Sequence, residues 1–379
     1  MRYSFVLFLL NISLLSCNSS ADNGESFTQI SNVKSKVSKL GIQDEAKALD
    51  SVFTRIKLKD FHLPVIDEAH ISALQNQKTL LAKRDLKKEK FGNLLISDTS
   101  LLSVINSLLA YQYTEPYELI DNLELYKIWG GDKKGHVQFT GYFTPIIYMN
   151  DTLDETYFYP IYNFPSKWEG LLPTREEIDG KFVLDGMGLE LAYAKDPVDI
   201  YFMQVQGSGY VKYPDGRLQL MEYNGSNRHP YRSIGKYIVK KEHLDLKDIS
   251  MDGIKEYLKI NHDQVDSLLF QNPSYTFFKF SNKKPRGAGQ VSLSKMISVA
   301  VDERYIPLGS CLLAKIPRVS KNGKVLDFEI KLLYAQDVGG AIKGTGHIDI
   351  YMGVGNNAKK QASNLYHYGE LYLLLPKQK

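Results

Sequence analysis

The stretch "YAQDVGGAIKGTGHIDIYMG" (residues 334–353) sets two aspartates, Asp337 and Asp349, among glycines, and a third, Asp302, lies upstream in "AVDERYIPLGS". Each aspartate follows an apolar run that indicates a β-strand, so we expect each at a strand end or a loop mouth. A carboxyl group that is partly desolvated there can have its pKa raised toward neutrality and serve as a proton donor. The alternative, and the commoner case for any single aspartate, is that it caps a turn or accepts backbone N–H groups.

Other chemistries have little support in the sequence. There is no phosphate-binding G-x-x-x-x-G-K-[ST] loop, no dinucleotide-binding G-x-G-x-x-G turn and no zinc-binding H-E-x-x-H. In "VQGSGY", Gln206 stands where a serine-hydrolase elbow needs its first glycine. The histidines show no metal-ligand spacing. The formal net charge of +4, which falls to +3 without residues 1–16 because Arg2 is their only charged residue, argues against nucleic acid. We expect no metal and no cofactor.

The N-terminus indicates a secreted and lipidated protein. Residues 1–16 combine a short charged start with the apolar run "FVLFLLNISLL", which is too brief for a stable membrane span. The block "LLSC" ending at Cys17 resembles a bacterial lipobox, in which the cysteine thiol receives a diacylglycerol. The alternative is a cleaved secretory signal with an incidental cysteine. Asn18, rather than Asp, follows the cysteine, and we therefore predict a periplasm-facing outer-membrane lipoprotein.

Changes in residue composition divide the chain into segments. Residues 17–45 are polar and predict a flexible tether. Helices are expected over 68–90 and 98–111, which lack internal glycine and proline, and again over 233–270.

From about residue 137 the chain becomes β-rich, with short runs separated by Gly, Pro, Asn and Asp. We include "VDIYFMQVQGSGYVKYPDGRLQLMEYNG" (198–225) among these runs, with "YPDGR" as a tight turn. "LGSCLLAKI" predicts a strand that buries Cys311 as a small hydrophobic residue. Because Cys311 is the only cysteine after Cys17, no intramolecular disulfide is expected.

Several motifs together resemble one bacterial family. The aspartate segments resemble the three-aspartate (3D) domain, a double-psi β-barrel module of cell-wall enzymes. Upstream, "FTGYFTP", "PTREEIDG", "LELAYAKDPVDIYFMQVQGSGYVKYPDGR", "YNGSNRHPYRSIG" and "NPSYTFFKF" resemble, in this order, the membrane-bound lytic murein transglycosylase A (MltA) family. The resemblance covers about two-thirds of the chain, from about residue 137 to the end.

The fold that this resemblance implies is mainly β with flanking helices. It consists of a double-psi β-barrel domain, an inserted second β-barrel-like domain and a groove between them that holds the glycan. The implied segments are 46–140 for the N-terminal part of the barrel domain with a helical start, 141–275 for the insert and 276–379 for the 3D barrel.

The activity that the resemblance implies is cleavage of the β-1,4 bond between MurNAc and GlcNAc in peptidoglycan without water. The sugar's own 6-hydroxyl attacks and leaves a 1,6-anhydro end. Because such attack is intramolecular, with effective molarities of about 10⁵ M or more, the second carboxylate of a hydrolase is dispensable. By its position in "HIDIYMG", the family's acid/base carries over to Asp349. Asp337 and Asp302 either keep Asp349 protonated by their negative charge or only brace the loop.

Nine further positions are expected to contact the glycan: Thr140, Tyr142, Gln204, Gln206, Gly207, Ser208, Gly339, Gly340 and Lys343. The alternative is that the glycines of "VQGSGY" form a turn and the tyrosine packs in the core. The expected partners are peptidoglycan strands and, through the lipid, a membrane, with the protein as a monomer. Two other functions stay open: a non-catalytic peptidoglycan-binding lipoprotein, and a glycoside hydrolase with Asp349 and Asp337 as its carboxylate pair.

Overall fold

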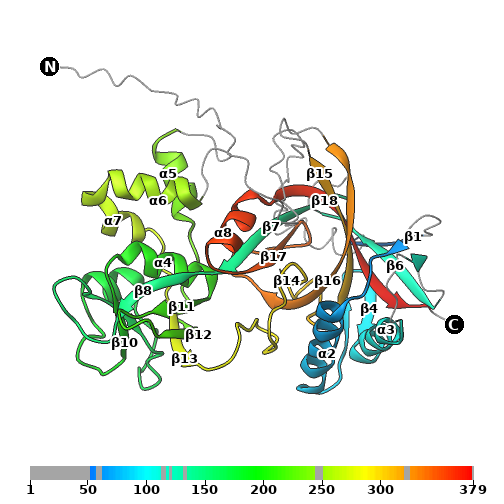
Figure 1. Cartoon of the computed structure of the whole chain (residues 1–379), viewed down its shortest axis with the longest axis horizontal. Helices are drawn as coiled ribbons and strands as arrows, with labels where there is room; N and C mark the ends of the chain where they lie inside the picture. Colours follow the sequence, from blue (N-terminus) through cyan, green and yellow to red (C-terminus); the bar gives the residue numbers. More distant parts are fainter. Residues whose placement is uncertain are drawn as a thin grey trace.

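The computed structural model describes residues 52–56, 62–111, 117–118, 122–130, 135–243, 251–319 and 325–377 (Figure 1). The predicted signal segment, tether and Cys17 lie outside these ranges. The described residues form the expected mainly β fold with flanking helices. One body is a closed barrel and the other is an inserted sheet domain.

Six strands close the barrel. Their order is β18-β15-β16-β14-β17-β7, and β7 pairs back onto β18 to complete the ring. The six strands are β7 (Val137–Thr144), β14 (Ser298–Val301), β15 (Cys311–Val319), β16 (Val325–Val338), β17 (His347–Val354) and β18 (Tyr366–Pro376). The pairs β14–β16 and β17–β7 are parallel, and the remaining pairs are antiparallel.

Shorter strands and helices complete this domain. The strands β6 and β1 extend the sheet beyond β18, and β2–β5 and β3–β4 form two small ribbons. Their bounds are β1 (Phe53–Ile56), β2 (His62–Leu63), β3 (Lys88–Phe91), β4 (Leu94–Ser97), β5 (Tyr117–Glu118) and β6 (Leu123–Ile128). The helices are α2 (Glu68–Ala82), α3 (Asp98–Ala110) and α8 (Gly355–Asn364).

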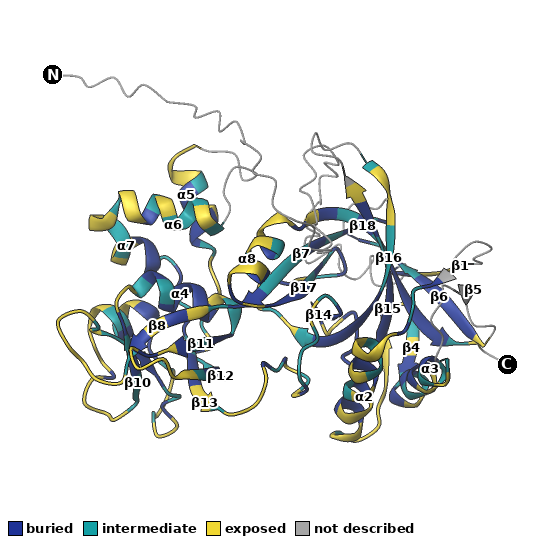
Figure 2. Cartoon of the chain, viewed as in Figure 1, coloured by how far each residue is buried: buried dark blue, intermediate teal, exposed yellow. Residues whose placement is uncertain are grey.

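Apolar side chains of the barrel strands and of α2 and α3 form one continuous core. Figure 2 shows the barrel strands largely in the colour of buried residues. Helix α3 starts at a reciprocal capping box between Ser97 and Ser100, which satisfies N–H groups at its first turn. Cys311 is buried on β15, as predicted. The helix predicted over 68–90 is wrong beyond Ala82, because the chain then forms the β3–β4 hairpin around Gly92, which has φ 55°.

The insert is built on a six-stranded sheet in the order β13-β12-β11-β8-β10-β9. Its strands are β8 (Ile146–Asn150), β9 (Tyr159–Tyr162), β10 (Glu190–Ala194), β11 (Ser208–Lys212), β12 (Leu218–Ser226) and β13 (Thr276–Ser281). The helices expected within 233–270 are confirmed as α5 (Ile234–Lys241), α6 (Met251–Ile260) and α7 (Val265–Leu269). None of the helices in the described ranges is both long and apolar enough to cross a bilayer.

One segment expected to be β-rich is a helix. Residues Pro197–Gln206 form α4, with Asp196 as N-cap accepting the Val198 N–H and Pro197 in the first turn. Gly207, at φ 78°, ends it in the left-handed conformation that glycine favours. The apolar run "VDIYFMQV" fits either a buried strand or a helix. The capping residues at its two ends favour the helix.

The insert is connected to the barrel at two neighbouring places. The chain leaves at the end of β7, passes Pro145 into β8, and returns through β13 toward β14. In the barrel, β7 and β14 lie on either side of β17. The expected boundary at 140/141 falls inside β7, which pairs with barrel strands along its length, and β13 belongs to the insert sheet up to Ser281.

Candidate active site

Two of the three aspartates lie in one cross-strand row of the barrel. Thr140 on β7 pairs with Asp349 on β17, Asp349 pairs with Ala300 on β14, and Ala300 pairs with Asp337 on β16. Because directly paired residues point to the same face of a sheet, this register brings the two carboxyl groups to one face, two strands apart. Asp349 is the third residue of β17 rather than at a strand end, which differs from the expectation.

Asp349 has the environment of a general acid. Its Oδ1 accepts a 2.7 Å hydrogen bond from the Thr140 hydroxyl, and the residue keeps partial exposure to solvent. Burial raises the pKa of Asp349 to about 7; the Thr140 bond lowers the pKa and the charge of Asp337 raises it. A carboxyl with this pKa is protonated in about half of the molecules at neutral pH, which suits it to both giving and taking a proton.

His347 adds a second group to this site that sequence reasoning missed. Its Nε2 lies 2.7 Å from the Thr140 hydroxyl oxygen. Because that hydroxyl donates to Asp349, Nε2 is assigned as the donor to the oxygen. Burial, helped by the charge of Lys236, lowers the pKa of His347 to about 4 and keeps it neutral. The available signal was the alternation in "HID", which places His347 and Asp349 on one strand face.

Asp337 is held by three donors. Its Oδ2 accepts from the Tyr142 hydroxyl at 2.7 Å, and its Oδ1 accepts the N–H groups of Ala288 and Val338, both at 2.8 Å. Gly287 allows this approach, since a Cβ there would lie 2.5 Å from the Gln336 carbonyl oxygen and 2.8 Å from the Asp337 Cβ. Burial still raises the pKa of Asp337 above its usual value, against these three hydrogen bonds.

Asp302 has a different environment. It forms a bidentate ion pair with Arg304, at 2.9 and 2.7 Å, and accepts the Gly344 N–H at 2.7 Å. Burial alone raises the pKa of Asp302, but the Arg304 guanidinium and the backbone N–H groups bring it below the ordinary value. Asp302 therefore holds the loop between β16 and β17 through Gly344, whose φ is 75°.

Aromatic side chains line the next part of the β7–β17 pair. The rings of Tyr142 and Tyr351, which are opposite each other in register, lie 5.3 Å apart. The hydroxyl groups of Tyr351 and Thr144 share a 2.9 Å hydrogen bond. Burial raises the pKa of Tyr351 to about 12, and Tyr210 of the insert adds to the rise. Tyr142 thus positions Asp337 and also packs against the ring of Tyr351.

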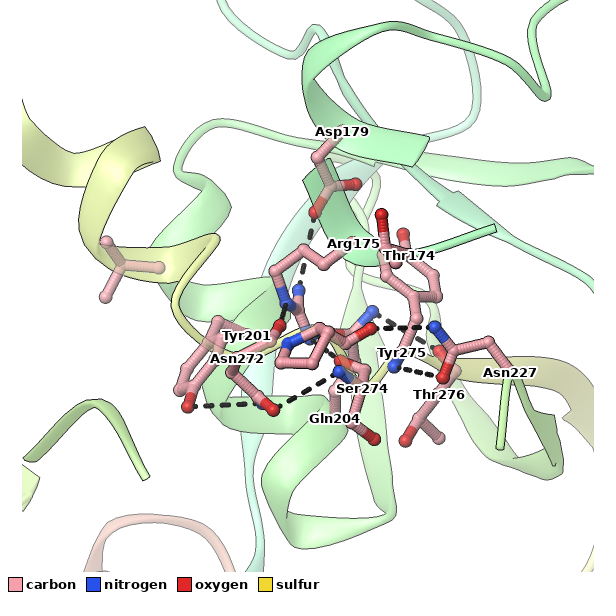
Figure 3. A network of polar contacts seen from close by, with 12 residues as sticks. Thr174, Arg175, Asp179, Tyr201, Gln204, Asn227, Asn272, Ser274, Tyr275 and Thr276 are labelled. Carbon is pink, nitrogen blue, oxygen red and sulfur yellow. Dashed lines mark hydrogen bonds and ion pairs between the residues drawn. The ribbon is translucent and has the colours of Figure 1, made fainter. Parts of the chain in front are cut away.

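Gln204, expected at the glycan, belongs to the interior of the insert. Its side-chain oxygen accepts a 2.6 Å hydrogen bond from the buried Arg175, and its amide nitrogen donates to the Thr276 carbonyl (Figure 3). On a strand, residues 204 and 206 would share a face, but on helix α4 they lie about 200° apart. The helix therefore turns Gln204 into the core, and its predicted contact with glycan is not supported by this placement.

The other predicted contacts have mixed surroundings. Gln206 accepts the Phe143 N–H at 2.9 Å and so joins α4 to β7, while Gly207 ends α4. Ser208 is buried on β11. Gly340 and Lys343 are exposed and Gly339 is half-buried in the β16–β17 loop, so their contact with glycan stays a prediction.

A further link joins the insert to the barrel beside Asp337. Arg286 donates to both carboxylate oxygens of Glu222 on β12, at 2.8 and 2.9 Å. Both side chains are largely buried. Arg286 lies two residues before Ala288, whose N–H binds Asp337, so one short loop contacts both the insert and the row of carboxyl groups. Within the part of the chain that the structure describes, no group of three or more His, Cys, Asp or Glu could hold a metal ion.

Comparison with known proteins agrees with this architecture. The family "MltA specific insert domain" matches residues 138–279, and the family "3D domain" matches residues 297–375. The chain is 41% identical over 256 residues to membrane-bound lytic murein transglycosylase A of Escherichia coli K12, covering 66% of this chain and 69% of that protein. It is 38% identical to the protein of the same name from Vibrio cholerae, over 65% and 68% of the two chains.

Solved structures give the same result. The crystal structure of E. coli MltA with bound chitohexaose superposes with a TM-score of 0.70 at 32% identity, covering 86% of this chain and 95% of that one. The membrane-bound lytic murein transglycosylase from Agrobacterium tumefaciens superposes with a TM-score of 0.68 at 27% identity, over 80% and 92% of the two chains.

Proposed function

The chain belongs to the membrane-bound lytic murein transglycosylase A family, and we propose that it is a peptidoglycan lytic transglycosylase in which Asp349 acts alone, first as acid and then as base. The bond cleaved is the β-1,4 link between MurNAc and GlcNAc. The product carries a 1,6-anhydro-MurNAc end, because the sugar's own 6-hydroxyl takes the place of water.

One observation carries this proposal: of the two neighbouring carboxyl groups, only Asp349 has an oxygen without a hydrogen-bond donor among the described residues, and so can act on a substrate. Asp349 has a pKa of about 7 and uses one oxygen, Oδ1, to accept from Thr140. Asp337 has both oxygens engaged, by Tyr142 on one side and by two backbone N–H groups on the other. A hydrolase needs its second carboxylate open toward the sugar or toward a water molecule. This difference favours one working carboxyl and a nucleophile supplied by the substrate.

In this reaction Asp349 first donates one proton and then accepts one. Protonated Asp349 gives its proton to the glycosidic oxygen as the bond from that oxygen to C1 of MurNAc breaks. The resulting carboxylate takes the proton of the 6-hydroxyl as that oxygen bonds to C1. Asp349 is protonated again at the end, so no water and no external base are consumed. The negative charge of Asp337 favours the protonated starting state.

Thr140 and His347 position the acid. Since the Thr140 hydroxyl donates to Oδ1, the proton that Asp349 delivers is carried on Oδ2. His347 directs the Thr140 hydroxyl by donating to its oxygen. Because His347 is neutral at neutral pH, it places no positive charge beside Asp349 that would lower the pKa of the acid.

The test is mass analysis of the products that the purified protein releases from sacculi. We expect muropeptides one water lighter than hydrolysed ones, and Asp349→Asn should lose them by a factor of about 10⁴ or more, because one group carries both proton transfers. Asn keeps the shape and still accepts from Thr140, so glycan binding should persist. Products of full hydrolytic mass would instead support the two-carboxylate hydrolase. Binding without any product from the unaltered protein would support the non-catalytic lipoprotein.

We also propose that Cys17 is lipidated and holds the enzyme at the periplasmic face of the outer membrane, as a monomer. The lipobox-like block at Cys17 and the names of the membrane-bound relatives support the membrane anchor. Cys17→Ser should release the protein into the soluble envelope fraction. Retention of this variant on membranes after a high-salt wash would contradict the lipid anchor.

A further inference from the structure

One face of the insert sheet turns toward the barrel. Two contacts and one electrostatic effect support this orientation. Ile146 on β8 packs against Gly355 at the start of α8, Tyr210 on β11 lies close enough to Tyr351 to raise its pKa, and Glu222 on β12 binds Arg286. The alternate residues of the same strands, including Ile147, Val211 and Met221, form the core of the insert on the opposite face.

The same face carries an exposed pair beyond these contacts. Tyr148 is the next outward residue after Ile146 on β8, and Lys212 is the next after Tyr210 on β11. Tyr148 and Lys212 are directly paired in the parallel register, and the Lys212 Nζ lies 5.7 Å from the centre of the Tyr148 ring. Tyr148 is 61% exposed. The pair lies two residues along the strands from Ile146 and Tyr210, a distance of about 7 Å.

The pair combines two properties that suit one class of ligand. An exposed tyrosine ring offers an apolar surface that a sugar ring can cover, while its hydroxyl stays in water. Lys212 adds a positive point charge over that ring, with its Nζ 5.7 Å from the ring centre. Among the described residues Lys212 forms no ion pair with a carboxylate, so its charge is available to a ligand. The residue opposite Lys212 on β12, Leu218, is also exposed and extends the apolar surface.

We propose that Tyr148 and Lys212 form an outer binding subsite for a sugar that carries a carboxylate, with the ring stacked on Tyr148 and the acidic substituent beside Lys212. This inference rests on the proposed function, because in peptidoglycan every second sugar bears a lactyl-peptide substituent with carboxylates. The subsite lies on the same face of the insert sheet as Ile146, Tyr210 and Glu222, farther from Asp349 than these residues. It selects the glycan by its peptide substituents rather than by the bond that is cut.

The test measures binding in the Asp349→Asn background, which separates affinity from chemistry. The two probes are chitohexaose, which is neutral, and a peptide-bearing peptidoglycan oligosaccharide of six sugars. Tyr148→Ala should weaken both by about tenfold, the loss expected for one aromatic contact. Lys212→Met keeps the aliphatic stem and should weaken only the acidic probe, by about threefold to tenfold at low salt, with the difference screened away at about 1 M salt.

Two matched variants control for surface effects. Tyr223→Ala removes a tyrosine that is 54% exposed on the neighbouring strand β12, one residue from Glu222 and therefore on the other face. Lys195→Met removes an exposed lysine of the insert. Both should leave both affinities unchanged. The subsite is refuted if Tyr148→Ala binds both probes normally, or if Lys212→Met weakens the neutral and acidic probes equally.

Failure of the proposed function gives a different result. If the unaltered protein forms no anhydro product while the Tyr148 and Lys212 variants show the expected losses, the subsite stands and the single-acid chemistry fails. If the Asp349→Asn protein binds neither probe, the subsite is refuted together with the glycan role of this face.

Discussion

The hydroxyl of Thr140 on β7 donates a 2.7 Å hydrogen bond to Oδ1 of Asp349, its direct partner in the parallel register on β17. This bond lowers the pKa of Asp349 while burial and Asp337 raise it, so the value near 7 is a balance of opposing effects. Two of these effects come from single residues, the hydrogen bond from Thr140 and the charge from Asp337. Substitutions that remove one at a time should move the balance in opposite directions.

Asp337→Asn removes a negative charge next to the acid. The pKa of Asp349 should fall, because its ionised form is then less disfavoured. The proposed mechanism requires protonated Asp349. The decline of kcat/KM with rising pH, expected near pH 7 in the unaltered enzyme, should therefore begin at lower pH. A pH profile measured from pH 4 to 9 checks this. A profile with an unchanged alkaline limb would show that Asp337 does not tune the acid.

Thr140→Val removes the donor and keeps the shape. The alkaline limb should move to higher pH, since the bond that favours the carboxylate is gone, while kcat falls because the carboxyl is no longer held in one orientation. Thr140→Ser is the control and should restore both. His347→Phe should lower kcat with a smaller change in pKa, because it acts through the Thr140 hydroxyl. Equal profiles for Val and Ser at position 140 would contradict this role.

Asp349→Asn should stabilise the folded protein in alkaline solution. The folded-state pKa of Asp349 is about 7, above the unfolded value, so the folded state binds more protons between these values and loses stability as pH rises through them. At pH 4 the substitution should have little effect. At pH 8 it should add about 1–3 kcal/mol to the free energy of unfolding, less than the full shift because the site keeps some solvent. Urea denaturation at both pH values measures it, and equal effects at pH 4 and 8 would argue against a raised pKa.

Gln204→Ala should destabilise the insert rather than weaken glycan binding. The substitution takes from the buried Arg175 its 2.6 Å acceptor, and an unsatisfied buried donor costs about 1–3 kcal/mol. Chemical denaturation measures the loss, and binding of chitohexaose to the folded protein should be unchanged. Gln271→Ala, at a half-buried glutamine of the insert outside this network, is the control. Normal stability with lost binding would return Gln204 to the glycan.

The sequence contained the main chemistry of the site but not its supporting contacts. The resemblance carried by the aspartate segments predicted Asp337 and Asp302 as neighbours of Asp349. Asp337 lies in the same cross-strand row, whereas Asp302 binds Arg304 and Gly344 instead. The donors that separate their roles come from far along the chain: Thr140 is 209 residues from Asp349, and Ala288 is 49 from Asp337. Single-sequence patterns do not specify such pairings, because they depend on the register of the closed barrel.

The inward position of Gln204 is not expected from the sequence, because residues Pro197–Gln206 are included among the β-rich runs and form a helix. An apolar run of eight residues is compatible with a buried strand or with a helix, and only the Asp196–Pro197 start and the Gly207 end distinguish them. Once the segment is a helix, Gln204 turns inward and only Gln206 reaches β7. The same ambiguity does not arise at β17, where the segment "HIDIYM" is short and is bounded by Gly346 and Gly353.

The insertion of one domain between β7 and β14 has a consequence for how this enzyme can evolve and be engineered. Both connections enter next to β17, the strand of Asp349, yet neither interrupts the ring of six strands that holds it. The insert, which carries the proposed glycan-binding subsite, can therefore be lengthened, resurfaced or exchanged as a module, while the ring of strands that holds the proposed acid is kept. A chimera should be joined at Pro145 and just after Ser281, where a foreign insert would meet an acid that is already assembled.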